Sequence, residues 1–214
     1  MAGRRDLPVP PGRTTLDGPP PVPSSYSPRA MAGLSRDERA WIRAAQAGSV
    51  SDLEALFRHH WPRAYRAAYL VVHDHAAAED IAQEAFLAAV RSLDSFDRDR
   101  PFGPWLHRIV INRAIDSARA KTARREVSGE SYLEATDPLA MAGGNPFTPT
   151  EARAVAAGLV SLPPEQRAVV VLRYLLEYTP GEIAELLELP RGTVNSRLRR
   201  GLDALQSQLA ESEE

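Results

Sequence analysis

No cysteine occurs among the 214 residues, so neither a disulfide nor a thiolate metal site can contribute to this protein. No apolar run is long enough to span a bilayer, and the basic start of the chain leads into prolines instead of a signal-peptide core. A nucleophile–base pattern and a phosphate-binding glycine loop are missing as well. We therefore expect a cytoplasmic protein without membrane insertion, without a cofactor and without catalytic activity of its own.

Four histidines superficially suggest a metal site, which is the remaining indication of an enzyme. His73 and His75 flank Asp74 at an expected helix start, where the aspartate is better explained as an N-cap. His59 and His60 are adjacent and so point in different directions on a helix. We expect no metal ion to bind here.

The net charge of −2 conceals two basic segments separated by an acidic one. Residues 101–125 carry a charge of +5 and residues 191–200 carry +4, whereas residues 126–150 carry −4. Separate basic segments can each bind phosphates while the average charge stays near zero.

The pattern after residue 34 is helical throughout, with no strand signal, which predicts an all-α fold. Eight of the eighteen prolines lie in residues 1–30, so a Pro-rich extension over 1–34 is expected to be disordered. Two small helical domains over 35–125 and 149–208 follow, joined by a flexible acidic linker over 126–148, with an acidic tail over 209–214. That linker would span about 27 Å as a coil and about 80 Å fully extended.

Helix starts in the first domain are predicted from capping patterns. Ser35 with Glu38, and Ser51 with Glu54, fit the capping box, and Pro62 should kink or break the second helix. A third helix is expected from about Asp74 to Leu93, and a fourth from the Pro101 and Pro104 region to about Lys121.

The second domain is expected to contain helices near 149–160, 164–176, 180–187 and 191–207. Thr179 to Glu182 forms another capping box, and Leu189 to Gly192 forms a turn between the last two helices. Val194, Leu198, Leu202 and Leu205 repeat as a buried seam of the last helix. This is a helix-turn-helix, whose second helix is expected to read duplex DNA in the major groove. The expected DNA-contacting residues are Arg191, Thr193, Asn195, Ser196, Arg197, Arg199 and Arg200. The alternative is an amphipathic surface helix with a solvated arginine-rich side.

One face of the third helix combines Asp80, Gln83, Glu84 and Leu87 at helical spacing. Acidic and amide groups beside an exposed leucine can form a protein-docking surface. On spacing alone, a solvated helix face is the more common explanation.

Aromatic residues alternate with arginines just after this helix. Phe96, Phe102 and Trp105 lie among Arg98, Arg100 and Arg108, which could stack on unpaired bases and hold phosphates. The alternative is that Phe102 and Trp105 are core anchors.

Several motifs together resemble the extracytoplasmic-function (ECF) group of bacterial RNA polymerase sigma factors, within the sigma-70 family. Residues 78–86, 101–109 and 112–116 are similar to region 2, and residues 162–167, 182–184 and 192–198 are similar to region 4. The resemblance covers about 36–125 and 149–208 in the right order.

The resemblance implies an alternative sigma factor that binds RNA polymerase core and directs promoter-specific initiation. Asp80, Gln83, Glu84 and Leu87 would bind the β′ clamp helices, the β subunit being a further partner. Region 4 would bind the minus-thirty-five element, and an anti-sigma factor would control the protein. The minus-ten element would be recognised and melted by Ser95, Phe96, Asp97, Arg98, Arg100, Trp105, Arg108, Asn112, Arg113 and Arg119.

The linker length agrees with this reading, because the two promoter elements lie about two helical turns, or about 70 Å, apart. An ordinary helix-turn-helix regulator that binds DNA without polymerase core remains the alternative. That alternative leaves the face with Asp80 and Glu84 unexplained.

Overall fold

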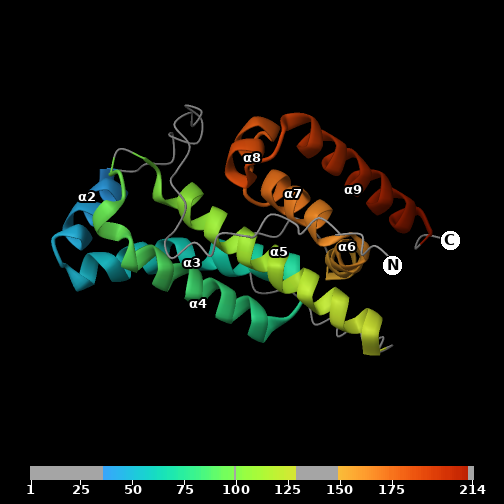
Figure 1. The fold of residues 1–214 in the computed structure, drawn as a ribbon, viewed down its shortest axis with the longest axis horizontal. Helices are drawn as coiled ribbons and strands as arrows, with labels where there is room; N and C mark the ends of the chain where they lie inside the picture. The colour runs from blue at the N-terminus through green and yellow to red at the C-terminus, as the bar shows by residue number, and fades with distance from the viewer. Residues whose placement is uncertain (1–35, 99, 129–148, 212–214) are drawn as a thin grey trace, which may run out of the picture.

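Eight α-helices and one 3₁₀ turn form the part of the chain that this computed structural model describes, residues 36–98, 100–128 and 149–211. The first group consists of α2 (Arg36–Gln46), α3 (Val50–Val72), α4 (His75–Arg91), η1 (Leu93–Ser95) and α5 (Phe102–Ser128). The second group consists of α6 (Pro149–Ser161), α7 (Pro164–Tyr174), α8 (Pro180–Leu187) and α9 (Arg191–Glu211). No strand occurs within these ranges, which confirms the all-α prediction (Figure 1). No helix in the described ranges is both long and apolar enough to cross a membrane.

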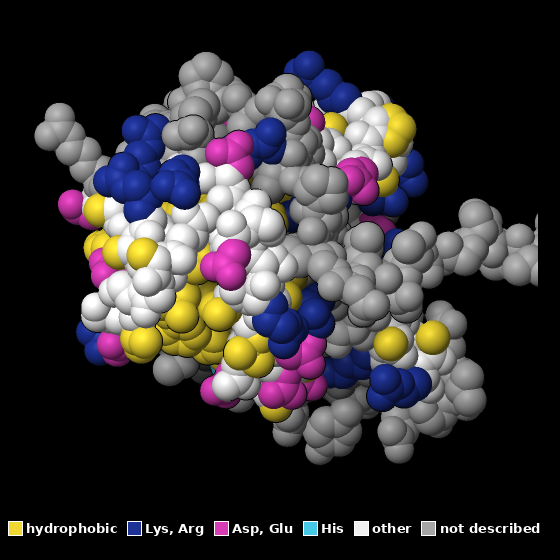
Figure 2. Space-filling view, turned by 60° about the vertical axis from the view of Figure 1, so that its left-hand side comes forward, with side chains coloured by type: hydrophobic (Ala, Val, Ile, Leu, Met, Phe, Trp, Pro, Cys, Tyr) yellow, Lys and Arg dark blue, Asp and Glu magenta, His cyan; other side chains and the backbone are white. Residues whose placement is uncertain are grey.

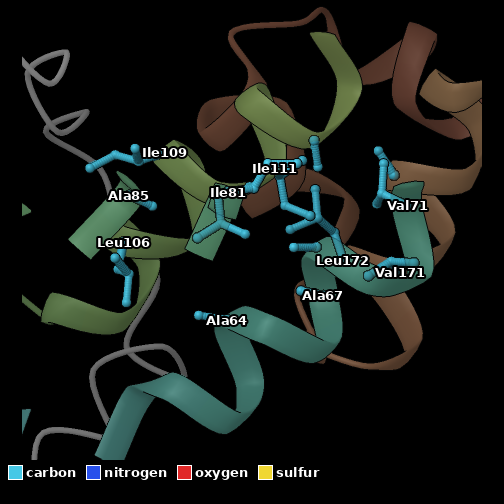
Figure 3. Close-up of a cluster of buried hydrophobic side chains, with 14 of the residues drawn as sticks. Ala64, Ala67, Val71, Ile81, Ala85, Leu106, Ile109, Ile111, Val171 and Leu172 are labelled. Atoms are coloured by element: carbon cyan, nitrogen blue, oxygen red, sulfur yellow. The ribbon is translucent and has the colours of Figure 1, made fainter. Parts of the chain in front are cut away.

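Small side chains let the three long helices of the first group pack closely. Ala64 and Ala67 of α3 are fully buried, as are Ala85 of α4 and Leu106 of α5. Figure 3 shows these residues in one cluster with Ile81 of α4. Alanine keeps helix propensity high and brings helix axes together, so larger neighbours can fill the remaining space.

Two predicted helix starts can be compared with the structure. Asp74 caps α4 as predicted, because its carboxylate accepts a hydrogen bond from the Ala77 amide at 3.1 Å. The prediction of a capping box at Ser51 and Glu54 is wrong. The cap of α3 is Ser49, which has extended backbone and accepts from the Asp52 amide, so Ser51 already lies within the first turn. Ser35 lies outside the described residues.

Two further expectations can be compared with the structure. Of the two effects predicted for Pro62, a kink or a break, the break does not occur, since α3 is one helix on both sides of the proline. The ring removes the hydrogen bond to the carbonyl of Arg58, which is an exposed residue. Ala64, just beyond the proline, is buried in the core, and this packing favours continuation of the helix. At the other end, α5 continues to Ser128, past the expected end at Lys121, because no glycine or proline interrupts the chain in between.

The second group has the helices predicted for it. Thr179 and Glu182 form a complete capping box at the start of α8, as predicted. Val194 and Leu198 bury the seam of α9 against Ile183 of α8 and its neighbours. Glycines allow α9 to approach closely, since a Cβ on Gly158 would lie 2.7 Å from Leu205 and one on Gly201 would lie 3.1 Å from Val170.

The two groups pack directly against each other. In Figure 1, α7 and α8 lie beside α5, and α6 and α7 also contact α3. Val171 and Leu172 of α7 share a buried cluster with Val71 of α3 (Figure 3). Much of the expected linker, residues 129–148, lies outside the described residues. The contact between the groups is long-range in sequence and was not anticipated from it.

Candidate nucleic-acid and polymerase interfaces

The face of α4 that was singled out by spacing lies on the surface. Asp80, Gln83 and Glu84 are exposed, and Leu87 is 52% exposed. Figure 2 shows hydrophobic side chains gathered on the face at the α2–α4 end of the molecule, with acidic and basic side chains around them. The exposed large hydrophobics of α3 and α4 are Val50, Phe57, Leu87 and Val90. An apolar surface with charged margins is typical of a protein-binding site.

One ion pair joins this face to the basic helix. Arg113 of α5 donates to the Glu84 carboxylate, and both side chains are partly exposed. An exposed pair of this kind adds about 0–1 kcal/mol of stability. It therefore restrains the two side chains weakly, and either can exchange its partner for a ligand.

The aromatic residues pack into the core instead of facing solvent. Phe96, Phe102 and Trp105 are each at least 94% buried, and the Phe96 and Trp105 ring centroids lie 4.6 Å apart. Phe102 completes the cluster with edge-on contacts to both. The expectation that Phe96 and Trp105 contact DNA directly is therefore corrected, because neither ring has a free face for a base in this structure.

The loop that follows η1 exposes its polar side chains. Ser95, Asp97 and Arg98 are exposed, and Arg100 pairs with Asp97 at 3.2 Å. Gln46 of α2 holds the start of this loop, since its amide nitrogen donates to the Leu93 and Phe96 carbonyls at 2.9 Å each. Gln46 was missed by sequence analysis, which has no signal for a side chain that bonds a backbone some fifty positions away.

The expected DNA-binding residues of α5 fall into two environments. Asn112 and Arg119 are exposed and Arg113 is half-buried, so these three can contact a ligand. Arg108 is different: its side chain is 4% exposed, and it donates to Glu188 of the second group at 2.5 Å. The expectation that Arg108 faces DNA is corrected for this structure, in which the second group covers it.

The helix-turn-helix is formed by α8, a short turn and α9. Glu188 ends α8 in the left-handed conformation, and the Leu189 amide donates to the Ala184 carbonyl at 2.9 Å. On α9, four expected DNA-contacting residues are exposed: Arg191, Asn195, Arg199 and Arg200. The other three are half-buried: Thr193, Ser196 and Arg197. Arg200 donates to the Ser196 hydroxyl, so these two side chains lie next to each other. Both kinds of group can form hydrogen bonds with base edges.

The boundary between the groups contains polar residues that sequence analysis also missed. Arg167 of α7 is buried and donates to carbonyls of both groups, and His107 of α5 lies 2.8 Å from the Tyr178 hydroxyl. A cavity of about 840 Å³ lies beside this pair and is lined from both groups, by Arg63 of α3 and Arg173 of α7 among others.

Comparison with known proteins identifies the chain. The family model for sigma-70 region 2 matches residues 56–124, and the model for sigma-70 region 4 matches residues 152–205. The ECF RNA polymerase sigma factor SigW of Bacillus subtilis is 37% identical over 153 residues, which are 68% of this chain and 82% of SigW. This chain belongs to the ECF family of RNA polymerase sigma factors.

Other relatives of this sigma factor agree with the assignment. The ECF sigma factor SigM of Mycobacterium tuberculosis is 34% identical over 182 residues, covering 84% of this chain and 89% of SigM. The solved structure of CnrH in complex with the cytosolic domain of CnrY matches with a TM-score of 0.61 at 27% identity, covering 82% of this chain and 98% of CnrH. The sigma factor RpoE of Bartonella quintana, solved with the anti-sigma factor NepR, shares the fold, with a TM-score of 0.61 at 22% identity over 75% of this chain and 98% of RpoE.

The free energy of unfolding of this sigma factor is expected to fall as the pH drops from 7.5 to 5.5. Burial, aided by His60 and Arg63, lowers the pKa of His107 to about 3, and burial beside Arg167 and Lys121 lowers the pKa of His73 to about 3. The folded protein keeps both rings neutral while the unfolded chain protonates them below pH 6.5. Stability is therefore fully present above that pH and is lost as the pH falls toward 3, by about 1.4 kcal/mol for His107 alone at pH 5.5.

Urea unfolding at the two pH values measures this loss, and carboxylates titrate mostly below the chosen window. The His107→Gln variant should show a shallower pH dependence than the wild type. Equal stability of the wild-type protein at pH 7.5 and 5.5 would contradict the assignment of neutral buried rings.

Proposed function

We propose that this sigma factor binds polymerase core through the exposed face of α4 and carries its helix-turn-helix to the minus-thirty-five element. The observation that supports the proposal most is the presence of both surfaces in one chain. A leucine that is 52% exposed lies next to acidic and amide groups on α4, while four exposed DNA-reading candidates lie on α9. A DNA-binding regulator that acts without polymerase needs only the second surface.

Core binding is assigned to Asp80, Gln83, Glu84 and Leu87. The acidic and amide groups would meet basic and polar groups of the β′ clamp helices, and Leu87 would be buried at the centre of the contact. Charged groups around such a contact set the encounter rate and orientation, and the buried apolar anchor supplies much of the affinity.

Minus-ten recognition is assigned to the polar loop after η1 and to the exposed side of α5. Ser95, Asp97 and Arg98 can form hydrogen bonds with an unpaired base, while Arg113 and Arg119 can hold phosphates. The aromatic cluster of Phe96, Phe102 and Trp105 gives the loop a rigid base. Flipping a base costs a few kcal/mol, and contacts of this kind can offset that cost.

Minus-thirty-five recognition is assigned to α9, whose N-terminal half carries Arg191, Asn195 and Arg200 on its surface. Arginine bonds guanine edges in two places and asparagine bonds adenine, so this set can discriminate among base pairs. The sequence of the preferred element does not follow from these residue types alone.

We further propose that an anti-sigma factor regulates this protein in the cytoplasm by covering its polymerase-binding and DNA-binding surfaces. CnrH was solved in complex with the cytosolic domain of CnrY. The apolar surface of α3 and α4, which includes Phe57 and Val90, is one that such a partner could bury.

The decisive experiment is transcription in vitro by purified core polymerase supplied with this protein, followed by mapping of the start sites. We expect initiation at a distinct set of promoters that core polymerase alone does not use. Absence of promoter-specific initiation on genomic templates, with core binding also absent, would favour the helix-turn-helix regulator instead.

The Arg200→Ala variant should lose about tenfold to a hundredfold in promoter affinity, since one good base contact contributes about 1–3 kcal/mol. Arg200 is exposed, so the fold should not change. Arg39→Ala is the matched control, because it removes an exposed arginine from α2, outside every proposed contact. Holoenzyme binding to a mapped promoter measures the effect. An Arg200→Ala variant that binds as well as the Arg39→Ala variant would remove Arg200 from the recognition set.

A further inference from the structure

A cavity of about 840 Å³ lies between the two helical groups, beside the His107–Tyr178 pair. The first group contributes Arg63 of α3 to its wall, and the second contributes Arg173 and Tyr174 from the last turn of α7. Small-molecule sites measure about 300–1,000 Å³ and occur preferentially at interfaces between domains. The size and the place of this cavity are therefore those of a ligand site.

The two arginines of the cavity carry positive charge that no carboxylate of the described residues neutralises. Arg173 makes one hydrogen bond, to the Tyr178 carbonyl at 3.2 Å, and takes part in no ion pair in the described ranges. The Arg63 side chain has neither an ion pair nor a hydrogen bond to any described residue. Its charge acts inside the cavity, because after burial and His60 it is Arg63 that lowers the pKa of His107.

Most of the carboxylates that line the same cavity are engaged elsewhere. Glu38 is buried and lies 3.1 Å from the His60 ring. Glu182 accepts hydrogen bonds from the Thr179 amide and hydroxyl at 2.7 Å each, as part of the capping box. Glu177 is the remaining carboxylate of the lining, and it is exposed. Two guanidinium groups without carboxylate partners favour an anion, and phosphate oxygens match their paired donors.

Tyr174 gives the cavity a surface on which a flat ring can stack. It is 59% exposed, more than any other phenylalanine, tryptophan or tyrosine that the structure describes. The Arg173 guanidinium lies 5.9 Å from the centroid of its ring. Aromatic side chains and arginines stack on nucleic bases, since every base has a π-face. Exposed aromatic surface next to unneutralised arginines is thus suited to a ligand with both a base and phosphates.

We propose that this cavity is a nucleotide site, in which Arg63 and Arg173 bind the phosphates and Tyr174 stacks on the base. A gap left by imperfect packing would require neither arginines without carboxylate partners nor an exposed tyrosine ring. The site goes beyond the proposed function and does not depend on it, because these three residues lie outside the surfaces assigned to polymerase and promoter DNA.

Isothermal titration calorimetry of the full-length free protein tests the proposal with ATP and GTP in turn. Adenosine and guanosine lack the phosphates, and inorganic tripolyphosphate lacks the base. We expect at least one nucleotide to bind at least about tenfold more tightly than its nucleoside and than tripolyphosphate, since stacking and phosphate contacts each add affinity. No binding of either nucleotide at millimolar concentration would overturn the proposal. Tripolyphosphate binding as tightly as both nucleotides would also overturn it, in favour of a simple polyanion site.

Two variants from different helical groups locate the nucleotide. Arg63→Ala should weaken binding by about tenfold to a hundredfold, the effect of losing a charged hydrogen bond to phosphate. Tyr174→Leu keeps an apolar side chain but removes the ring, and should weaken binding by about tenfold. Both side chains are exposed, so the fold should persist, and urea unfolding checks that it does.

Arg58→Ala is the matched control for these variants. Arg58 is an exposed arginine of the same helix as Arg63, and it lies outside the cavity, where it pairs with Glu54. Its variant should bind the nucleotide like the wild type. If Arg63→Ala or Tyr174→Leu binds as tightly as Arg58→Ala, the nucleotide does not occupy this cavity as proposed. Equal loss in Arg58→Ala and Arg63→Ala would reduce the binding to general surface charge and overturn the site as well.

Discussion

Charge reversal at Asp80 is expected to abolish detectable binding of this sigma factor to polymerase core. Asp80 is exposed on α4 beside Gln83 and Glu84, so Asp80→Arg should leave the bundle intact. A misplaced charge in a desolvated protein contact costs about 2–5 kcal/mol, which corresponds to about thirtyfold to several thousandfold in affinity. Transcription from every promoter should fall together, because core binding precedes promoter choice.

Glu79→Arg is the matched control for that variant. Glu79 is also exposed, and its replacement by arginine changes the charge by the same amount. Its side chain lies about 100° around the helix from that of Asp80. Fluorescence titration of labelled protein with purified core measures both affinities. If Asp80→Arg binds core like Glu79→Arg does, the α4 face is a solvated surface and the regulator without polymerase becomes the better reading.

Helix starts could be predicted from sequence because their causes are local. Asp74 and the Thr179–Glu182 box satisfy amides within three residues of themselves, so a short window contains everything that decides them. The wrong prediction at Ser51 also has a local cause, because Ser49, two residues earlier, is the N-cap of α3 instead. The break that was one of two predicted effects of Pro62 does not occur, and α3 is packed against α4 and α5, which are later elements of the chain.

The burial of the aromatic residues near the minus-ten loop could not be decided from spacing. Alternation of Phe96, Phe102 and Trp105 with arginines is compatible with base stacking and with a core cluster. The two alternatives differ only in where α5 lies relative to η1, which is a tertiary property. The exposed face of α4 was predictable because helical periodicity fixes which residues share a face, and burial of Ile81 and Phe86 then orients the helix.

The contacts between the two groups are the feature of the fold that could least be predicted from the sequence. Arg108 and Glu188 are eighty positions apart in the sequence. Nothing in the sequence around either residue distinguishes it from an ordinary charged surface residue. The resemblance to a family assigned Arg108 to DNA, whereas in this structure its side chain is buried and paired with Glu188.

The largest loss of stability is expected from Arg167→Met. The Arg167 side chain donates to the carbonyls of Leu159 at 2.7 Å, Val160 at 2.6 Å and Leu162 at 2.8 Å, and also to that of Val71. These carbonyls lie at or just beyond the ends of α6 and α3, where the regular helical hydrogen bonds run out. Methionine fills similar volume but leaves several buried carbonyls without this donor, at a cost of about 3 kcal/mol or more in the free energy of unfolding.

Arg167→Lys separates the charge of this residue from its shape. Lysine keeps the positive charge, but its single nitrogen cannot reach four carbonyls on two helix ends as the planar guanidinium does. We therefore expect Arg167→Lys to lose most of the same stability, whereas Arg173→Met, on the same helix and with one carbonyl bond at 3.2 Å, should lose about 1 kcal/mol. Urea unfolding at pH 7.5 gives all three values. Full stability in Arg167→Lys would mean that charge alone matters at this position, and that the forked geometry does not join the two groups.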